Sequence, residues 1–298
     1  MRRRPGSAVL DLLLLIILLG GAIAALLGAD LFPSELAGSA LPEATPPSAR
    51  HIFGTDALGR DMLARLLEGM RTTMAIGIGA TILAIMMGSI YGGIAGLAGS
   101  RTDEVMMRGV DVGFSLPYMF LVILLVSLAG ERSLLLLFMA LGLVEWLPLS
   151  RVVRAGVRNL RGEAFIEASR MMGAGRLYVL RSHLFPNLGG PLVVYATLML
   201  PVVMMQEAFL SFLGLGVAPP MASWGTLVAD GVARMETAPW ILLTAGLSLA
   251  VWLVSLHLAG DRLARRLNVH RTTGAVDRVM RADYHADEEI SRLGECER

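Results

Sequence analysis

Residues 163–187 read EAFIEASRMMGAGRLYVLRSHLFPN and form the one long interior stretch that is amphipathic and not uniformly apolar. Apolar side chains recur at helical spacing, beginning with Phe165 and Ile166, while acidic and arginine side chains occupy the other faces. The pattern predicts a short helix outside a bilayer, a bend at Gly173, and a second helical piece that Pro186 ends. Long apolar runs flank the stretch on both sides, so this helix is placed to be moved by another protein.

The chain as a whole is too apolar for a soluble domain. Of its 298 residues, 55% are hydrophobic and 17% are charged, and the mean hydropathy is +0.63. Several runs reach the ~20 apolar residues that a membrane span requires. All 26 basic residues are Arg, so the lysine of a P-loop is absent and ATP hydrolysis by the usual nucleotide-binding fold is excluded. The composition therefore predicts an all-α polytopic membrane protein, and any ATPase must be a separate chain.

The apolar runs predict six transmembrane helices. We place them at residues 9–27, 72–97, 105–128, 134–149, 188–209 and 240–259. The corresponding domains are an N-terminal anchor at 1–29, an extracytoplasmic connection at 30–71, a core of five spans at 72–262 with the loop 160–187, and a tail at 263–298. The first run has the flanks of a secretory signal, but its length and the spans after it favour an uncleaved anchor.

The placement of the arginines predicts the orientation. Six spans put both termini on the same side of the membrane. With the termini inside, 20 of the 26 arginines fall in cytoplasmic segments. The amphipathic stretch then faces the cytoplasm.

The second predicted span carries a small residue at every fourth position from Ala80 to Gly96. In lipid, such a stripe lets a neighbouring helix approach closely, so we interpret it as a packing seam and not as a solute site. In the connection ahead of this span, the expected capping residue is Thr55 or Asp56.

Glu145 and Glu207 fall within or near predicted spans. A charged side chain is costly inside a bilayer, so each of them should face protein or water. For Glu145 two interpretations stay open. It pairs with a neighbouring helix or the interface, or it faces a pore and recognises a cationic group on a solute.

One motif of the amphipathic stretch resembles the Glu-Ala-Ala loop of ATP-binding-cassette importer permeases. It consists of Glu167, Ala168 and Ser169, then Gly173, then Pro186 thirteen residues further on. Ser169 replaces the third Ala of that loop, a change between two small residues. We expect Gly173 to be small because a partner or the returning chain lies against it.

Two further segments resemble the dipeptide, oligopeptide and nickel permeases of that family. They read HIFGTDALGRD at 51–61 and QEAFLSFLGLGVAPPMASWG at 206–225, and the resemblance covers residues 50–265. In the second segment, the glycines and the adjacent prolines cannot continue a helix, so the chain must turn at the membrane surface. The resemblance also makes Asp111 a structural acid near the cytoplasmic side. Glu145 departs from the family, which usually has Gly before the Trp.

The resemblance implies a permease subunit of an ATP-driven importer of di- or oligopeptides, with a cytoplasmic coupling helix and no catalytic role. The residues expected to couple to the ATPase are Glu163, Glu167, Ala168, Ser169, Gly173 and Pro186. The gate or pore candidates are Glu145, Glu207, Gly214, Gly216 and Trp224. No cofactor or metal is expected in this chain, because ATP and magnesium would be bound by partner chains.

The implied partners are a homologous second permease subunit, two ATPase subunits, an extracytoplasmic solute-binding protein and membrane lipid, without nucleic acid. The implied location is a bacterial or archaeal inner membrane with both termini cytoplasmic. A nickel or other small-solute importer shares every motif above. A proton-driven carrier would need its own coupling site among the acids Asp111, Glu145 and Glu207.

Overall fold

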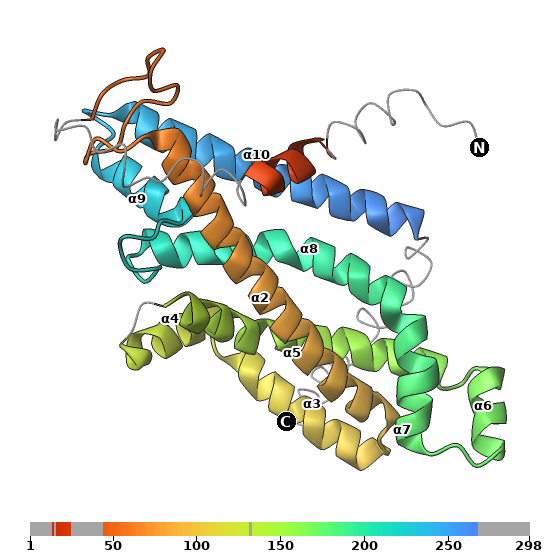
Figure 1. Cartoon of the computed structure of the whole chain (residues 1–298). Helices are drawn as coiled ribbons and strands as arrows, with labels where there is room; N and C mark the ends of the chain where they lie inside the picture. Colours follow the sequence, from red (N-terminus) through yellow and green to blue (C-terminus); the bar gives the residue numbers. More distant parts are fainter. Residues whose placement is uncertain (1–13, 15, 25–43, 131–132, 268–298) are drawn as a thin grey trace, which may run out of the picture.

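The computed structural model describes residue 14 and residues 16–24, 44–130 and 133–267 (Figure 1). The named elements in this part of the chain are all helical: α2 (Met62–Leu97), α3 (Ser100–Ser115), α4 (Tyr118–Ala129), α5 (Leu134–Leu160), α6 (Ala164–Met171), α7 (Arg176–Val179), the π-helix η1 (Leu180–Leu184), α8 (Phe185–Phe212), α9 (Trp224–Ala233) and α10 (Pro239–Arg266). The all-α prediction is confirmed.

Four helical units among the described residues are long and apolar enough to cross a membrane, and a bent pair of helices raises the number to as many as five. The four are α2, α5, the continuous unit Arg176–Phe212, and α10. The predicted first span, 9–27, lies partly outside the described residues, although 16–24 are helical. The chain is thus a multi-pass membrane protein, and the count of six spans stays a prediction.

The third span predicted at 105–128 is not a single helix. Helices α3 and α4 meet at a bend of 80°. Leu116, between them, has an extended backbone, with φ −93° and ψ 138°. Pro117 explains the break, because proline lacks an N–H and disfavours the helical conformation of the residue before it.

The prediction that Pro186 ends a helix was wrong. Helix α7 passes through η1 into α8, and Pro186 lies in the first turn of α8. The π-helical turn just before it changes the hydrogen-bond register, so the missing N–H of proline does not interrupt the helix. Pro191 and Pro201 also lie inside α8.

The start of α2 and the end of α10 differ from the predicted limits, whereas the start of α5 agrees with its prediction. Helix α2 begins ten residues earlier than expected, capped by Asp61, whose Oδ1 accepts from the backbone N–H of Leu63 at 2.7 Å. Helix α10 continues past Gly260 to Arg266. Helix α5 starts at Leu134 as predicted and carries its arginine-rich extension to Leu160.

The small-residue stripe of α2 packs against α5, which confirms the seam. A Cβ added at Gly88 would lie 2.9 Å from the Leu149 side chain, and one at Gly96 would lie 2.6 Å from Val157 Cγ1. At Gly92 it would collide with the backbone carbonyl of Ser150. Because a backbone atom cannot move aside as a side chain can, Gly92 is the tightest point of this seam.

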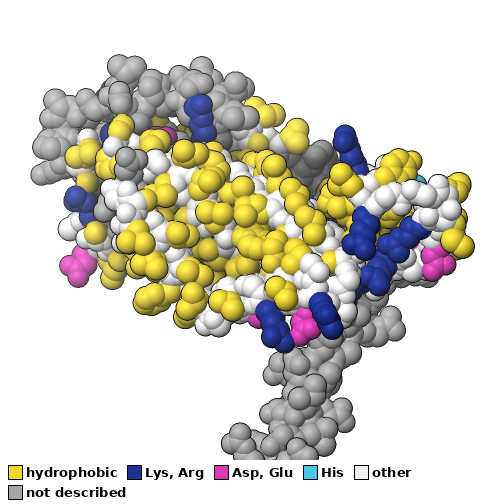
Figure 2. All heavy atoms as spheres, turned by 90° about the horizontal axis from the view of Figure 1, so that it is seen from below, with side chains coloured by type: hydrophobic (Ala, Val, Ile, Leu, Met, Phe, Trp, Pro, Cys, Tyr) yellow, Lys and Arg dark blue, Asp and Glu magenta, His cyan; other side chains and the backbone are white. Residues whose placement is uncertain are grey.

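The outer surface of the helices is apolar over a broad area. Figure 2 shows hydrophobic side chains covering the middle of one face, with arginine and acidic side chains toward the ends. Exposed Ile, Leu, Val and Phe side chains on α2, α4 and α10 contribute to the apolar surface of the chain. This distribution fits a molecule whose middle lies in hydrocarbon.

We expect Gly92→Leu to destabilise the isolated subunit, because the new side chain would force α2 and α5 apart. Overpacking typically costs about 1–3 kcal/mol, and more where backbone is struck. Thermal unfolding in detergent, with the yield of monodisperse protein, measures the effect.

The matched control is Gly246→Leu in α10, where an added Cβ meets no atom within 4 Å. The seam would be contradicted by equal unfolding temperatures and yields for the two variants.

Candidate functional site

Helix α6 lies at one end of the molecule, beyond the ends of α5 and α7, whereas α9 lies at the opposite end (Figure 1). Glu163 is its N-cap position and Glu167 lies in its first turn. Acidic side chains there interact favourably with the positive end of the helix dipole. The short helix predicted in the amphipathic stretch is confirmed by α6. We call residues 163–187 the α6 loop.

The conformation of Gly173 explains why a glycine follows α6. Its φ is +88°, in the left-handed region that glycine adopts without steric cost. The N–H of Ala174 donates to the carbonyl of Ser169 at 3.1 Å, which closes the end of the helix. No atom of the described residues lies within 4 Å of a Cβ added at Gly173. The expectation that the returning chain lies against it was wrong.

Buried apolar residues fasten the α6 loop to the spans. Ile166 from α6 and Val179 from α7 are fully buried. They belong to one cluster with Leu184 and with Leu149 and Val157 from α5. Displacing α6 therefore displaces the adjoining ends of α5 and α8.

A polar contact adds to this attachment. Ser169 is buried, and its Oγ lies 3.2 Å from Nε2 of His183. The His183 ring makes edge contacts with Phe165 and Tyr178, with centroids 6.3 and 5.7 Å apart. The serine that replaces the family's Ala thus gains a hydrogen-bond partner across the loop.

The outward side of the α6 loop is apolar. Met171, Met172 and Leu177 are 90%, 83% and 76% exposed. A hollow of about 540 Å³ lies beside them, lined by Phe165, Ser169, Met172, Gly173, Ala174, Gly175, Tyr178 and His183. Met172 and Leu177 continue the apolar pattern that begins with Phe165 and Ile166, and the structure turns this part of the pattern outward. Exposed apolar residues beside arginines at one end of a membrane protein are typical of a protein-binding surface.

The predicted coupling residues come together on this loop. Glu163, Glu167 and Ala168 are exposed on α6, and Ser169 is buried beneath them. Pro186 is exposed at the start of α8, three residues after His183, which contacts Ser169.

The second family-like segment forms a turn at the opposite end, as predicted. Helix α8 ends at Phe212, Gly214 has a φ of +81°, and α9 begins after the N-cap Ser223. An added Cβ at Gly216 would collide with the Ser211 side chain. Both glycines are therefore required by the shape of the turn.

Trp224 and Glu207 are buried within the chain. Trp224 Nε1 donates to the carbonyl of Leu66 at 3.1 Å. Glu207 is fully buried, and its Oε1 accepts from Ser211 Oγ at 2.6 Å. This burial favours a role in holding the turn against α2 over direct contact with solute. Among the pore candidates, Glu145 is the one polar side chain that is half-buried.

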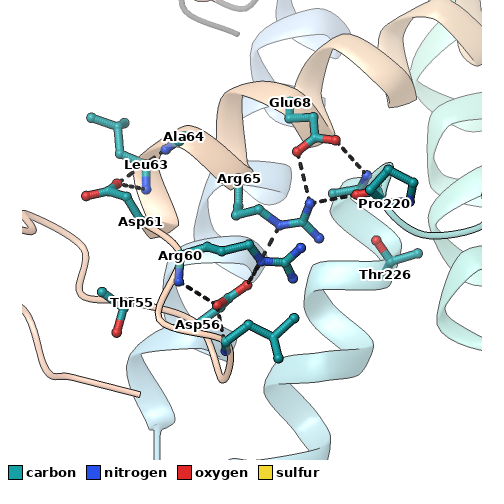
Figure 3. A network of polar contacts seen from close by, with 12 residues as sticks. Thr55, Asp56, Arg60, Asp61, Leu63, Ala64, Arg65, Glu68, Pro220 and Thr226 are labelled. Atoms are coloured by element: carbon teal, nitrogen blue, oxygen red, sulfur yellow. Dashed lines mark hydrogen bonds and ion pairs between the residues drawn. The ribbon is translucent and has the colours of Figure 1, made fainter. Parts of the chain in front are cut away.

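Arg65 joins the two distant family-like segments (Figure 3). Its Nη1 donates to Glu68 Oε2 at 2.9 Å and to the carbonyl of Pro220 at 3.0 Å, and Glu68 Oε1 accepts from the N–H of Ala222 at 3.2 Å. Its Nε lies 3.9 Å from Asp56 Oδ2. We call these five residues the Arg65 clasp.

Within the clasp, Asp56 also fixes the conformation of the segment 51–61. It accepts from the backbone N–H groups of Leu58 and Arg60 and from Arg60 Nε, at 2.6–2.9 Å. Asp56 is therefore a loop-forming residue and not the N-cap of a helix. The sequence analysis missed Arg65, because its bond to the turn after α8 is to the backbone carbonyl of Pro220, 155 residues away.

Asp230 of α9 lies near this clasp. Burial raises the pKa of the Asp230 carboxyl, and the charge of Arg65 acts against that shift. The arginine thus contributes to the electrostatics of α9 as well as to the turn before it.

Ion pairs also connect α3 to α5. Asp103 is buried and bonds Arg154 through Nε and Nη2 at 2.5 and 2.7 Å, with Arg158 Nη2 also at 2.5 Å. Asp111 pairs with Arg151. Asp111 thus has a structural partner, in keeping with its interpretation from the resemblance.

These features define a multi-pass helical membrane protein with a surface helix between two of its spans. Residues 84–269 match the family described as "Binding-protein-dependent transport system inner membrane component", and the chain belongs to this family. It is accordingly a non-catalytic membrane component of such a transport system.

The chain is similar to curated relatives over most of its length. It is 42% identical over 218 residues to the oligopeptide transport system permease protein OppC of Haemophilus influenzae, covering 73% of this chain and 70% of the relative. It is 37% identical over 256 residues to the dipeptide transport system permease protein DppC of Bacillus subtilis, covering 85% and 80%.

Its fold also resembles a solved transporter chain. The match is to an inward-facing conformation of the MetNI methionine ABC transporter, with a TM-score of 0.54 and 20% identity, covering 69% of this chain and 97% of that one. This similarity supports the helical fold.

We expect Arg65→Gln to lower the unfolding temperature in detergent by roughly 3–8 °C. The change removes charge-assisted hydrogen bonds of about 1.5–3 kcal/mol and leaves the carbonyl of Pro220 without this donor.

Arg108→Gln is the matched control, because Arg108 and Glu104 form an exposed pair within α3. Exposed pairs contribute about 0–1 kcal/mol, so its shift should be small. Equal shifts for the two variants would remove the clasp as a stabilising feature.

Proposed function

We propose that this chain is one of two permease subunits of an ATP-driven importer of di- or oligopeptides and forms half of the translocation pathway. The similarity to oligopeptide and dipeptide permease proteins supports the peptide substrate. The observation that carries the coupling role is the α6 loop, which is fastened to two spans on one side and exposes methionines on the other.

The proposed partners are a homologous second permease subunit, two ATPase subunits and an extracytoplasmic solute-binding protein. The ATPases bind ATP and magnesium, and they dock on the α6 loop. Glu167 and Ala168, exposed beside the methionines, contact the docking cleft.

Coupling follows from how α6 is attached. ATP brings the two ATPases together and α6 moves with its cleft. The buried contacts of Ile166 and Val179 pass this movement to α5 and α8, whose tilting switches the pathway between inward- and outward-facing. This is a two-state element whose equilibrium a ligand on another subunit biases.

A nickel importer of the same family remains the alternative for the substrate. ATP-dependent uptake of a labelled dipeptide, tripeptide or nickel by the reconstituted complex separates the two. Peptide uptake is the expected outcome, and uptake of nickel alone would overturn the peptide assignment.

We expect Glu167→Lys and Met172→Glu to leave membrane insertion intact and to reduce co-purification of the ATPase subunits at least tenfold. A charge reversal in a docking cleft costs several kcal/mol, and about 1.4 kcal/mol corresponds to a factor of ten. The apolar runs that drive insertion are unchanged.

The matched control is Glu236→Lys, a charge reversal at an exposed position just before α10, at the other end of the molecule. Normal ATPase recovery with both α6-loop variants would contradict the coupling role. A loss with Glu236→Lys as well would show that the effect is not specific to the loop.

The arginine count supports a topology in which the α6 loop and both termini are cytoplasmic. In a Cys296→Ser background, Ala49→Cys should react with a membrane-impermeant maleimide added to spheroplasts, and Ser182→Cys should react only after lysis. Both positions are exposed. The reverse labelling pattern would invert the topology.

A further inference from the structure

Glu145 is an acidic residue of a membrane span without a basic partner among the described residues. It lies on α5, and its Oε1 accepts a hydrogen bond from Gln206 Nε2 of α8 at 2.8 Å. By contrast, Asp103 and Asp111 of α3 pair with arginines of the later part of α5. A neutral amide orients the Glu145 carboxylate but does not neutralise it.

The depth of Glu145 makes its charge costly. It lies eleven residues after Leu134, the first residue of α5. At about 1.5 Å per residue this is about 17 Å along the helix, well inside a hydrocarbon layer of about 30 Å. Charged side chains at this depth almost always face a protein interior or a water-filled path, and they mark solute pathways.

The surroundings of Glu145 open onto a face that the described elements leave uncovered. Glu145 is half-buried. Tyr195 of α8 packs against the same buried cluster as Val144, the residue before Glu145. Met205 and Phe209, the near neighbours of Gln206 in sequence, are exposed. The group therefore lies at the edge of the uncovered face and not in the core of the subunit.

The same group has unused hydrogen-bond acceptors. Gln206 is only 6% exposed, yet its Oε1 is buried without a hydrogen-bond partner among the described residues. The hydrogen bond described for Glu145 uses Oε1, which leaves Oε2 for another donor. A buried acceptor without a donor is costly, so this arrangement favours a ligand that brings N–H groups and positive charge.

We propose that Glu145, oriented by Gln206, is a specificity-determining residue of the translocation pathway that binds ammonium or guanidinium groups of the solute. The inference rests on the proposed function, because a pathway through this face requires a transporter. It assigns Glu145 a preference for solutes with basic side chains.

The test uses the complete transporter in proteoliposomes, with its ATPases and binding protein, and three tripeptides: Ala-Lys-Ala, Ala-Ala-Ala and Ala-Glu-Ala. Wild type should transport Ala-Lys-Ala in preference to Ala-Glu-Ala. Glu145→Gln should lower this ratio about tenfold, and Glu145→Asp, which keeps the charge, should retain most of it. Stimulation of the ATPase by the loaded binding protein should be unchanged, since the change does not touch the α6 loop.

Glu145→Cys in a Cys296→Ser background provides a second measurement that does not depend on Glu145→Gln folding normally. An anionic methanethiosulfonate reagent should restore the preference for Ala-Lys-Ala, and a cationic one should reverse it. Lack of reaction during turnover would overturn the proposal, because Glu145 would then face lipid or an arginine of the second subunit.

The outcomes separate this inference from the proposed function. If wild type transports no peptide, the peptide assignment fails. If wild type transports peptides and Glu145→Gln has an unchanged ratio, the role of Glu145 alone fails. Reduced assembly of Glu145→Gln with the second subunit, at an unchanged ratio, would likewise assign Glu145 to subunit contact and overturn the proposal.

Discussion

The close approach of α2 to α5 is the constraint on which the other helix positions depend. Gly88, Gly92 and Gly96 bring the two backbones together over about two turns of helix. Inside a bilayer the hydrophobic effect does not drive helices together, so they are held by close packing. Helix α5 in turn positions Glu145 in its middle and, at its far end, Val157 and the α6 loop.

Elements with a strong local pattern could be predicted from the sequence. Runs of apolar residues predicted α5 and most of α8. The small residues at every fourth position predicted the packing seam of α2. The limits of helices were predicted less well where proline was involved. Pro117 breaks a helix, whereas Pro186 does not. The difference arises from the π-helical turn η1 just before Pro186, which could not be predicted from the sequence pattern.

The candidate sites show the same division. The residues of the α6 loop are neighbours in the sequence, so the helical pattern was enough to predict that they lie close together. Arg65 and Gln206 were missed because their roles depend on partners from distant parts of the chain. The bend predicted at Gly173 agrees with its left-handed backbone conformation, whereas the returning chain does not lie against it.

The Arg65 clasp has a consequence for how this chain can vary. The segments 51–61 and 206–225 are far apart in sequence, yet one guanidinium bonds both the start of α2 and the turn after α8. A chimaera that exchanged one segment for that of a distant relative would leave Arg65 or Glu68 with a mismatched partner. We therefore expect the two segments to be exchangeable only together, although more than 140 residues of chain separate them.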